Sequence, residues 1–94
     1  MMADAGLDAT VQRAIALYNR TRSPEVTAKL VLISPALLIV SFTGGFCYGC
    51  GIQDYVEGFA EQFKALSGKY QLKVGKTREV NARVFEADFN VEWR

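Results

Sequence analysis

Residues 26–43 read VTAKLVLISPALLIVSFT, two apolar runs separated by Ser34-Pro35-Ala36. Both runs are rich in branched side chains, which favour extended backbone, and the Ser-Pro pair between them is typical of a tight turn. We therefore expect one strand over residues 26–33, a second over residues 37–43, and an antiparallel hairpin that joins them. Each run is too short to cross a bilayer, so this stretch predicts buried strands and not a membrane helix.

An amphipathic helix is expected before this hairpin and another after it. Apolar residues at helical spacing predict the first helix over about residues 5–21, ended by Ser23-Pro24 because proline cannot continue the hydrogen-bond ladder. A second apolar stripe predicts a helix that ends at Leu66, with Asp54 and Glu57 at capping-box spacing and Gly68 as a left-handed cap. The two stripes are Leu7, Val11, Ala14, Ile15 and Tyr18, and Tyr55, Val56, Phe59, Phe63 and Leu66.

The last third of the chain predicts two more strands. Tyr70, Leu72 and Val74 alternate with polar residues, which indicates a half-buried strand, and Gly75 to Arg78 is the expected turn. The alternation then resumes and runs to Trp93, but it shifts by one position at Val84-Phe85. A shift of phase of this kind predicts either a bulge or a strand that crosses from one packing partner to another.

These elements predict the order α-β-β-α-β-β and an α+β fold, in which two helices pack on a mostly antiparallel sheet of about four strands. At 94 residues the chain is expected to form a single domain, 1–94, around one core. No internal repeat is visible in the sequence.

Composition and charge narrow the function classes. Eleven basic and ten acidic side chains leave a net charge of +1, which gives no whole-protein argument for a nucleic acid or an anionic membrane as partner. The first residues lack the basic and apolar segments of a secretory signal, so a cytoplasmic location and no membrane partner are expected.

The run Gly45-Phe46-Cys47-Tyr48-Gly49-Cys50-Gly51 holds both cysteines of a chain that has no histidine. It lies between an expected strand and an expected helix, where the positive end of the helix dipole favours a thiolate. Cys-x-x-Cys can present two sulfurs to one ion, but a closed zinc site or an iron–sulfur cluster wants four ligands. A metal would therefore bridge two chains, take Asp54 as an oxygen ligand, or keep open positions.

Helix, hairpin, Gly-x-Cys-x-Gly-Cys and helix, in that order, resemble the C-terminal domain of NifU-like (Nfu) iron–sulfur scaffold proteins over about residues 7–66. The resemblance implies that Cys47 and Cys50 bind a cluster shared between two copies, and that the cluster is passed to recipient proteins. It also implies that Gly45 and Gly49 let the loop fold around the cluster.

Two other interpretations of the cysteine pair remain open. Strand, Cys-x-x-Cys and helix is also the order of thiol–disulfide exchange proteins, although the tryptophan and proline of the thioredoxin motif are absent. Alternatively, Cys47 and Cys50 are structural residues of a non-enzymatic interaction module, either buried as thiols or joined in a short-loop disulfide. Neither a phosphate-binding glycine loop nor a nucleophile elbow is present, and we do not expect an enzyme.

Basic side chains concentrate on the expected C-terminal hairpin, where they could follow a phosphate backbone. Acidic residues dilute their charge, so a solvated hairpin face is the competing interpretation. The basic residues are Lys69, Lys73, Lys76, Arg78 and Arg83.

A homodimer is the last prediction. Phe89, Val91 and Trp93 alternate with polar residues at the end of the chain, and an aromatic strand there would suit an edge that pairs with its copy. Such a dimer would also suit a bridged cofactor, either an iron–sulfur cluster or zinc.

Overall fold

The computed structural model describes residues 5–22, 25–44 and 52–93 of the chain. Helix α1 (Ala5–Arg22) is followed by strands β1 (Val26–Ile33) and β2 (Leu37–Gly44), and helix α2 (Ile52–Leu66) by β3 (Tyr70–Asn81) and β4 (Val84–Trp93). The expected order α-β-β-α-β-β and the α+β fold are thus confirmed.

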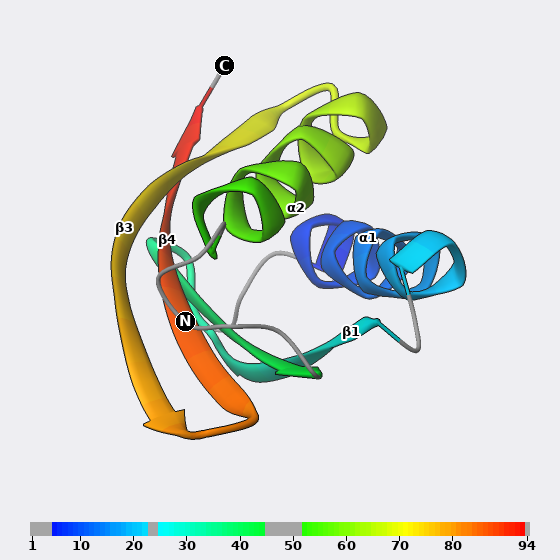
Figure 1. Cartoon of the computed structure of the whole chain (residues 1–94). Coiled ribbons are helices and arrows are strands. Elements are labelled where there is room, and N and C mark those ends of the chain that lie inside the picture. Colours follow the sequence, from blue (N-terminus) through cyan, green and yellow to red (C-terminus); the bar gives the residue numbers. More distant parts are fainter. Residues whose placement is uncertain (1–4, 23–24, 45–51, 94) are drawn as a thin grey trace.

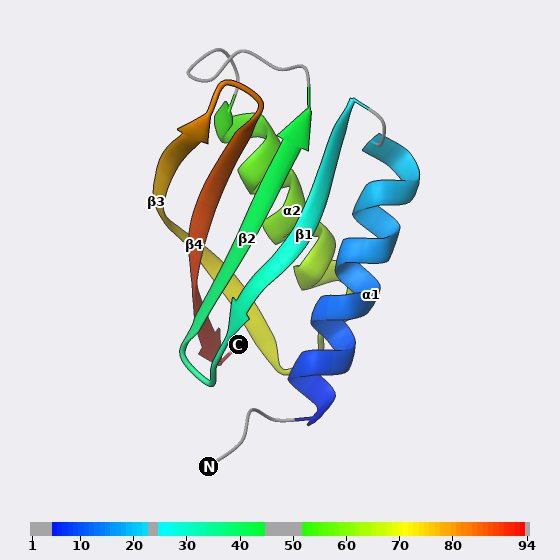
Figure 2. The same ribbon diagram turned by 90° about the horizontal axis from the view of Figure 1, so that it is seen from below.

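The four strands form one antiparallel sheet in the order β1-β2-β4-β3. The sheet curls around the two helices, which both lie on its concave face (Figure 1). Seen from below, the strands lie in front of α2, and α1 runs alongside β1 (Figure 2). No described element covers the convex face, which we call the open face. No helix in the described ranges is long and apolar enough to cross a membrane.

The structure contains a repeat that the sequence does not reveal. Each half of the fold is a helix, an edge strand and an inner strand, and the two inner strands, β2 and β4, pair antiparallel at the centre. The halves are therefore related by an approximate twofold axis perpendicular to the sheet. Their helices bury residues at the same spacing, Leu7, Val11, Ala14 and Tyr18 in α1 and Ile52, Val56, Phe59 and Phe63 in α2.

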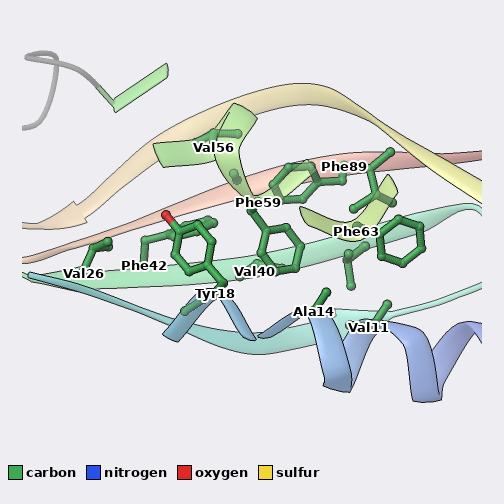
Figure 3. Packing of buried hydrophobic residues seen from close by; sticks show 14 of the residues in the cluster. Val11, Ala14, Tyr18, Val26, Val40, Phe42, Val56, Phe59, Phe63 and Phe89 are labelled. Atoms are coloured by element: carbon green, nitrogen blue, oxygen red, sulfur yellow. The ribbon is translucent and has the colours of Figure 1, made fainter. Parts of the chain in front are cut away.

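The core lies between the helices and the concave face, and aromatic rings fill its centre (Figure 3). Phe59 from α2 contacts Tyr18, Phe42 and Phe89, with ring centroids 5.6, 6.1 and 5.4 Å away. Edge-to-face and tilted contacts of this kind are favourable for aromatic quadrupoles. One ring thereby joins α2 to α1 and to both inner strands.

Both predicted caps of α2 were wrong. The helix begins at Ile52, so Asp54 lies inside its first turn, and Glu57 accepts a hydrogen bond from Nε2 of Gln53 at 2.7 Å. At the other end Gly68 does not adopt the left-handed conformation. Instead the hydroxyl oxygen of Ser67 accepts bonds from the backbone N–H groups of Lys69 and Tyr70, at 3.2 and 2.9 Å. Serine hydroxyls often satisfy backbone donors in this way.

The predicted turn at Gly75 to Arg78 was also wrong, because β3 continues to Asn81 and the chain reverses at Ala82-Arg83. The pairing of β3 with β4 shifts register between Val74 and Thr77, which is where the extra residues are accommodated. A Cβ on Gly75 would lie 3.2 Å from the backbone oxygen of Asp88, so glycine here allows close strand approach in a bulge.

The phase shift at Val84-Phe85 has a different cause from the predicted bulge. It marks the start of β4 directly after the hairpin turn, where a new strand with its own alternation begins. β4 is also not an edge, because it lies between β2 and β3. The prediction that Phe89, Val91 and Trp93 lie on an edge strand was therefore wrong, and the edges of the described sheet are β1 and β3.

Candidate functional site

The predicted site residues Gly45, Cys47, Gly49 and Cys50 lie outside the described residues. The structure does describe both ends of the connection that carries them. Gly44 is the last residue of β2 and Ile52 is the first residue of α2. Residues 45–51 therefore join the two halves of the fold, and their anchors define the candidate site.

Gly44 is held on two sides. Its N–H donates to the carbonyl oxygen of Arg83, at 2.9 Å, which ties the end of β2 to the β3–β4 turn. On the other side a Cβ would overlap the carbonyl oxygen of Glu25 and lie 3.1 Å from Cα of Val26. Only glycine allows β1 and β2 to approach so closely at this point. The strand end that leads into the cysteine segment is thus fixed by its neighbours.

The start of α2 is held by a second set of contacts. Tyr55, in the first turn of α2, donates its hydroxyl to Oε2 of Glu25 at 2.9 Å. The hydroxyl of buried Tyr18 donates to the backbone oxygen of Tyr55 at 3.0 Å. These bonds connect α2 to the start of β1 and to α1. Glu25 therefore contacts both anchors, Gly44 through its backbone and Tyr55 through its carboxylate.

Arg22 completes this group. Its guanidinium carbon lies 5.2 Å from the ring centroid of Tyr18 and 5.9 Å from that of Tyr55, within the range of cation–π attraction. A Cβ on Gly58 would lie 2.8 Å from an Arg22 nitrogen, so the absence of a side chain on α2 leaves room for the guanidinium. We call Tyr18, Arg22, Glu25, Tyr55 and Gly58 the anchor cluster.

The anchor cluster favours the protonated, neutral form of the Tyr18 and Tyr55 hydroxyl groups. Burial raises the pKa of Tyr18 above its ordinary value, and the nearby Arg22 charge opposes this only in part. The hydrogen bond to Glu25 raises the pKa of Tyr55. Both tyrosines therefore remain donors at neutral pH, and the contacts that hold α2 are retained. Because α2 begins at Ile52, directly after residue 51, the positive end of its dipole adjoins the cysteine segment.

The five basic residues of the predicted patch do not gather at one place. Lys69 precedes β3 and Arg83 follows it, so the two lie at opposite ends of that strand. Arg78 is within 3.0 Å of both Glu86 and Asp88 on the open face, and its hydrogen bond to Asp88 raises its pKa. Of the five, only Lys73 and Lys76 are both exposed and close to each other along β3, near the bulge. The charge available to a phosphate backbone is smaller than the sequence suggests.

The described ranges contain no group of three or more cysteine, histidine, aspartate or glutamate side chains that could hold a metal ion. Asp54, which the sequence offers as an oxygen ligand, is exposed on the first turn of α2.

Sequence reasoning missed Glu25 and Arg22 as parts of the candidate site. The hydrogen bond from Tyr55 to Glu25 spans 30 positions, and nothing local to either residue indicates it. One signal was present, because Arg22 and Glu25 flank the Ser23-Pro24 break between the first helix and the first strand. Tyr18 and Tyr55 were expected only as apolar-face residues, and their hydroxyl contacts were not foreseen.

Comparison of the chain with models of protein families, with curated proteins and with solved structures finds no significant match.

Proposed function

We propose that this chain holds a thiophilic metal ion or an iron–sulfur cluster through Cys47 and Cys50, and that it acts as a carrier or scaffold. The observation that supports this most directly is the position of the cysteine segment. Both thiols belong to the connection between β2 and α2, whose ends are held at Gly44 by the carbonyl of Arg83 and at Tyr55 by the carboxylate of Glu25. Fixed ends reduce the ordering cost of bringing two sulfurs to one ion.

The donor set fits an iron–sulfur cluster shared by two copies. Each chain supplies two thiols and no imidazole, so two chains together supply the four thiolates that such clusters usually require. A tetrahedral zinc site would have the same requirement. The adjacent N-terminus of α2 would stabilise the ionised thiols. The dimer is then a consequence of shared ligands and needs no paired strand edges. The cluster is cargo for a recipient protein.

The first test is anaerobic purification followed by analysis for iron, zinc and sulfide and by a visible absorption spectrum. We expect an iron–thiolate charge-transfer band, with iron and sulfide, that disappears in the Cys47→Ser/Cys50→Ser variant. Gly68→Ala is the matched control, because a Cβ there meets nothing within 4 Å. A metal-free protein that takes up neither zinc nor a reconstituted cluster would overturn the proposal.

Sedimentation supplies the second test. The loaded protein is expected to sediment as a dimer and the metal-free protein as a monomer. A loaded monomer would remove the shared-ligand arrangement. A metal-free protein whose thiols interconvert reversibly with a disulfide at a physiological potential would favour thiol–disulfide exchange instead.

A further inference from the structure

Strand β1 is an edge strand whose composition favours pairing with a further strand. Its sequence VTAKLVLI contains one charge and neither glycine nor proline. Val31 and Leu32 are large apolar side chains with 50% and 44% of their surfaces exposed. Its inner side pairs with β2, and no strand of the described residues lies on its outer side. An apolar edge of this kind is a template for a further strand.

The side chain of Asn19 occupies this outer side at Ala28. Its Oδ1 accepts a hydrogen bond from the N–H of Ala28 at 2.7 Å, and its Nδ2 donates to the carbonyl oxygen of Ala28 at 3.0 Å. In an antiparallel hydrogen-bonded pair, a residue of the neighbouring strand makes this same pair of bonds. The carboxamide, presented by α1, therefore takes the place that a strand would take.

The other edge is protected differently. β3 shifts register twice against β4, between Val74 and Thr77 and between Glu79 and Asn81, and these irregularities disturb a straight edge. Lys73 and Lys76 are exposed along it, and edge lysines oppose pairing. β1 has one lysine and one register shift, between Leu30 and Leu32. The middle of β1 instead relies on α1, which runs alongside it and bonds to Ala28 through Asn19 (Figure 2).

We propose that Asn19 is a guard that keeps β1 from pairing with β1 of a second copy of this chain. Sequence complementarity favours a second copy as the strand that would replace it. An antiparallel pair centred on Ala28 aligns residues 26–30 of the two copies, with Val26 opposite Leu30 and Lys29 opposite Thr27. The two Lys29 side chains therefore do not face each other, and Val31 and Leu32 lie just beyond the paired residues. Without the carboxamide, the bonds from α1 to Ala28 are lost, and the N–H and carbonyl of Ala28 become available to their counterparts in that copy when the end of α1 moves aside.

The test is the Asn19→Ala variant, compared with wild type and with Thr21→Ala. Thr21 is a matched control because, among the described residues, its hydroxyl donates to backbone oxygens of α1, those of Leu17 and Tyr18. In sedimentation velocity of the metal-free proteins we expect Asn19→Ala to self-associate with rising concentration, at least tenfold more tightly than the other two. Hydrogen exchange then localises the contact: the Ala28 amide exchanges fast in dilute Asn19→Ala and slows as dimers form.

A folded Asn19→Ala variant that remains monomeric at high micromolar concentration would overturn the proposal. Association in which the Ala28 amide stays fast would overturn it too, because the contact would then lie elsewhere. If Asn19→Ala does not fold, Asn19→Ser decides, since its shorter side chain lacks the paired acceptor and donor that bond to the N–H and carbonyl of Ala28. Association above the wild-type level supports the guard, and association equal to wild type refutes it.

Discussion

Gly44 and Gly68 are glycines for different physical reasons. At Gly44 any side chain would meet the backbone of Glu25, which cannot move without disturbing β1. At Gly68 a Cβ would meet no atom within 4 Å, and the backbone is not left-handed. The left-handed cap predicted at Gly68 was wrong, and the structure shows the more crowded position to be Gly44.

We expect Gly44→Ala to lower the free energy of unfolding by about 2–3 kcal/mol, because a backbone must shift to admit the methyl group. Gly68→Ala should leave it unchanged or raise it by up to about 1 kcal/mol, because alanine has less freedom in the unfolded chain. Urea denaturation followed by circular dichroism measures both. Equal effects of the two substitutions would contradict the proposed crowding at Gly44.

Tyr18 makes the free energy of unfolding depend on pH in the alkaline range. Its pKa is raised in the folded state by burial, whereas in the unfolded state it is about 10. Above that pH the unfolded chain releases the proton that the folded chain keeps, so the unfolded state binds fewer protons and stability falls as pH rises. The contribution is fully present below about pH 10.

The free energy of unfolding of the wild type should therefore decline above about pH 10, and Tyr18→Phe should decline less steeply. The variant also loses the bond to the Tyr55 carbonyl, which lowers stability by about 1 kcal/mol at neutral pH. Urea titrations at a series of pH values measure both effects. An ultraviolet titration in which every tyrosine of the folded protein ionises with a pKa near 10 would be inconsistent with this account.

At the scale of elements, the link between α2 and β3 depends on one hydroxyl. Ser67 is 6% exposed and its oxygen accepts from two backbone donors, Lys69 and Tyr70. Ser67→Ala should lower the free energy of unfolding by about 1–2 kcal/mol, because two backbone hydrogen bonds to the hydroxyl are lost. Thr21→Ala, which removes a hydroxyl bonded within α1, should cost under about 0.5 kcal/mol. Guanidinium denaturation distinguishes the two, and a harmless Ser67→Ala would show that water replaces the hydroxyl.

Elements with a single strong periodicity could be predicted from the sequence. The β1–β2 hairpin and both helices follow from branched runs, a Ser-Pro turn and apolar spacing, and their bounds agree within about two residues. The turn at Gly75 could not be predicted, because glycine marks both turns and bulges and the choice depends on the backbone of Asp88. The position of β4 in the sheet depends on pairing with β2 across the whole of α2, which no local pattern encodes.

The candidate site divides in the same way. Cys47 and Cys50 could be identified because thiols are rare and chemically distinct, and their roles stay predictions. The anchor cluster could not be identified from the sequence. Arg22 and Glu25 look like ordinary surface residues there, and their contacts form only when α1, β1 and α2 come together. The positive charge available on the C-terminal hairpin was overestimated from the sequence. Arg78 pairs with Glu86 and Asp88, and this pairing follows from the register of β3 on β4, which the sequence does not show.

At the scale of the whole molecule, the fold is two helix–strand–strand halves joined at the cysteine segment. The halves share their pattern of buried helix positions, although the residues differ, with alanine and tyrosine in α1 where α2 has two phenylalanines. The repeat was missed in the sequence because it lies in burial and topology and not in residue identity. Phe59 and the pairing of β2 with β4 join the halves into one core.

This arrangement makes the order of the halves along the chain interchangeable. The start of α1 and the end of β4 lie at the same end of the molecule (Figure 2). A circular permutant that begins at Ile52 and links Trp93 to Ala5 through a flexible spacer would keep every helix, strand and pairing of the fold. It would turn the cysteine segment from an internal connection into a chain terminus, tethered at Gly44 alone. The contribution of double tethering to cofactor affinity could then be separated from that of the thiols themselves.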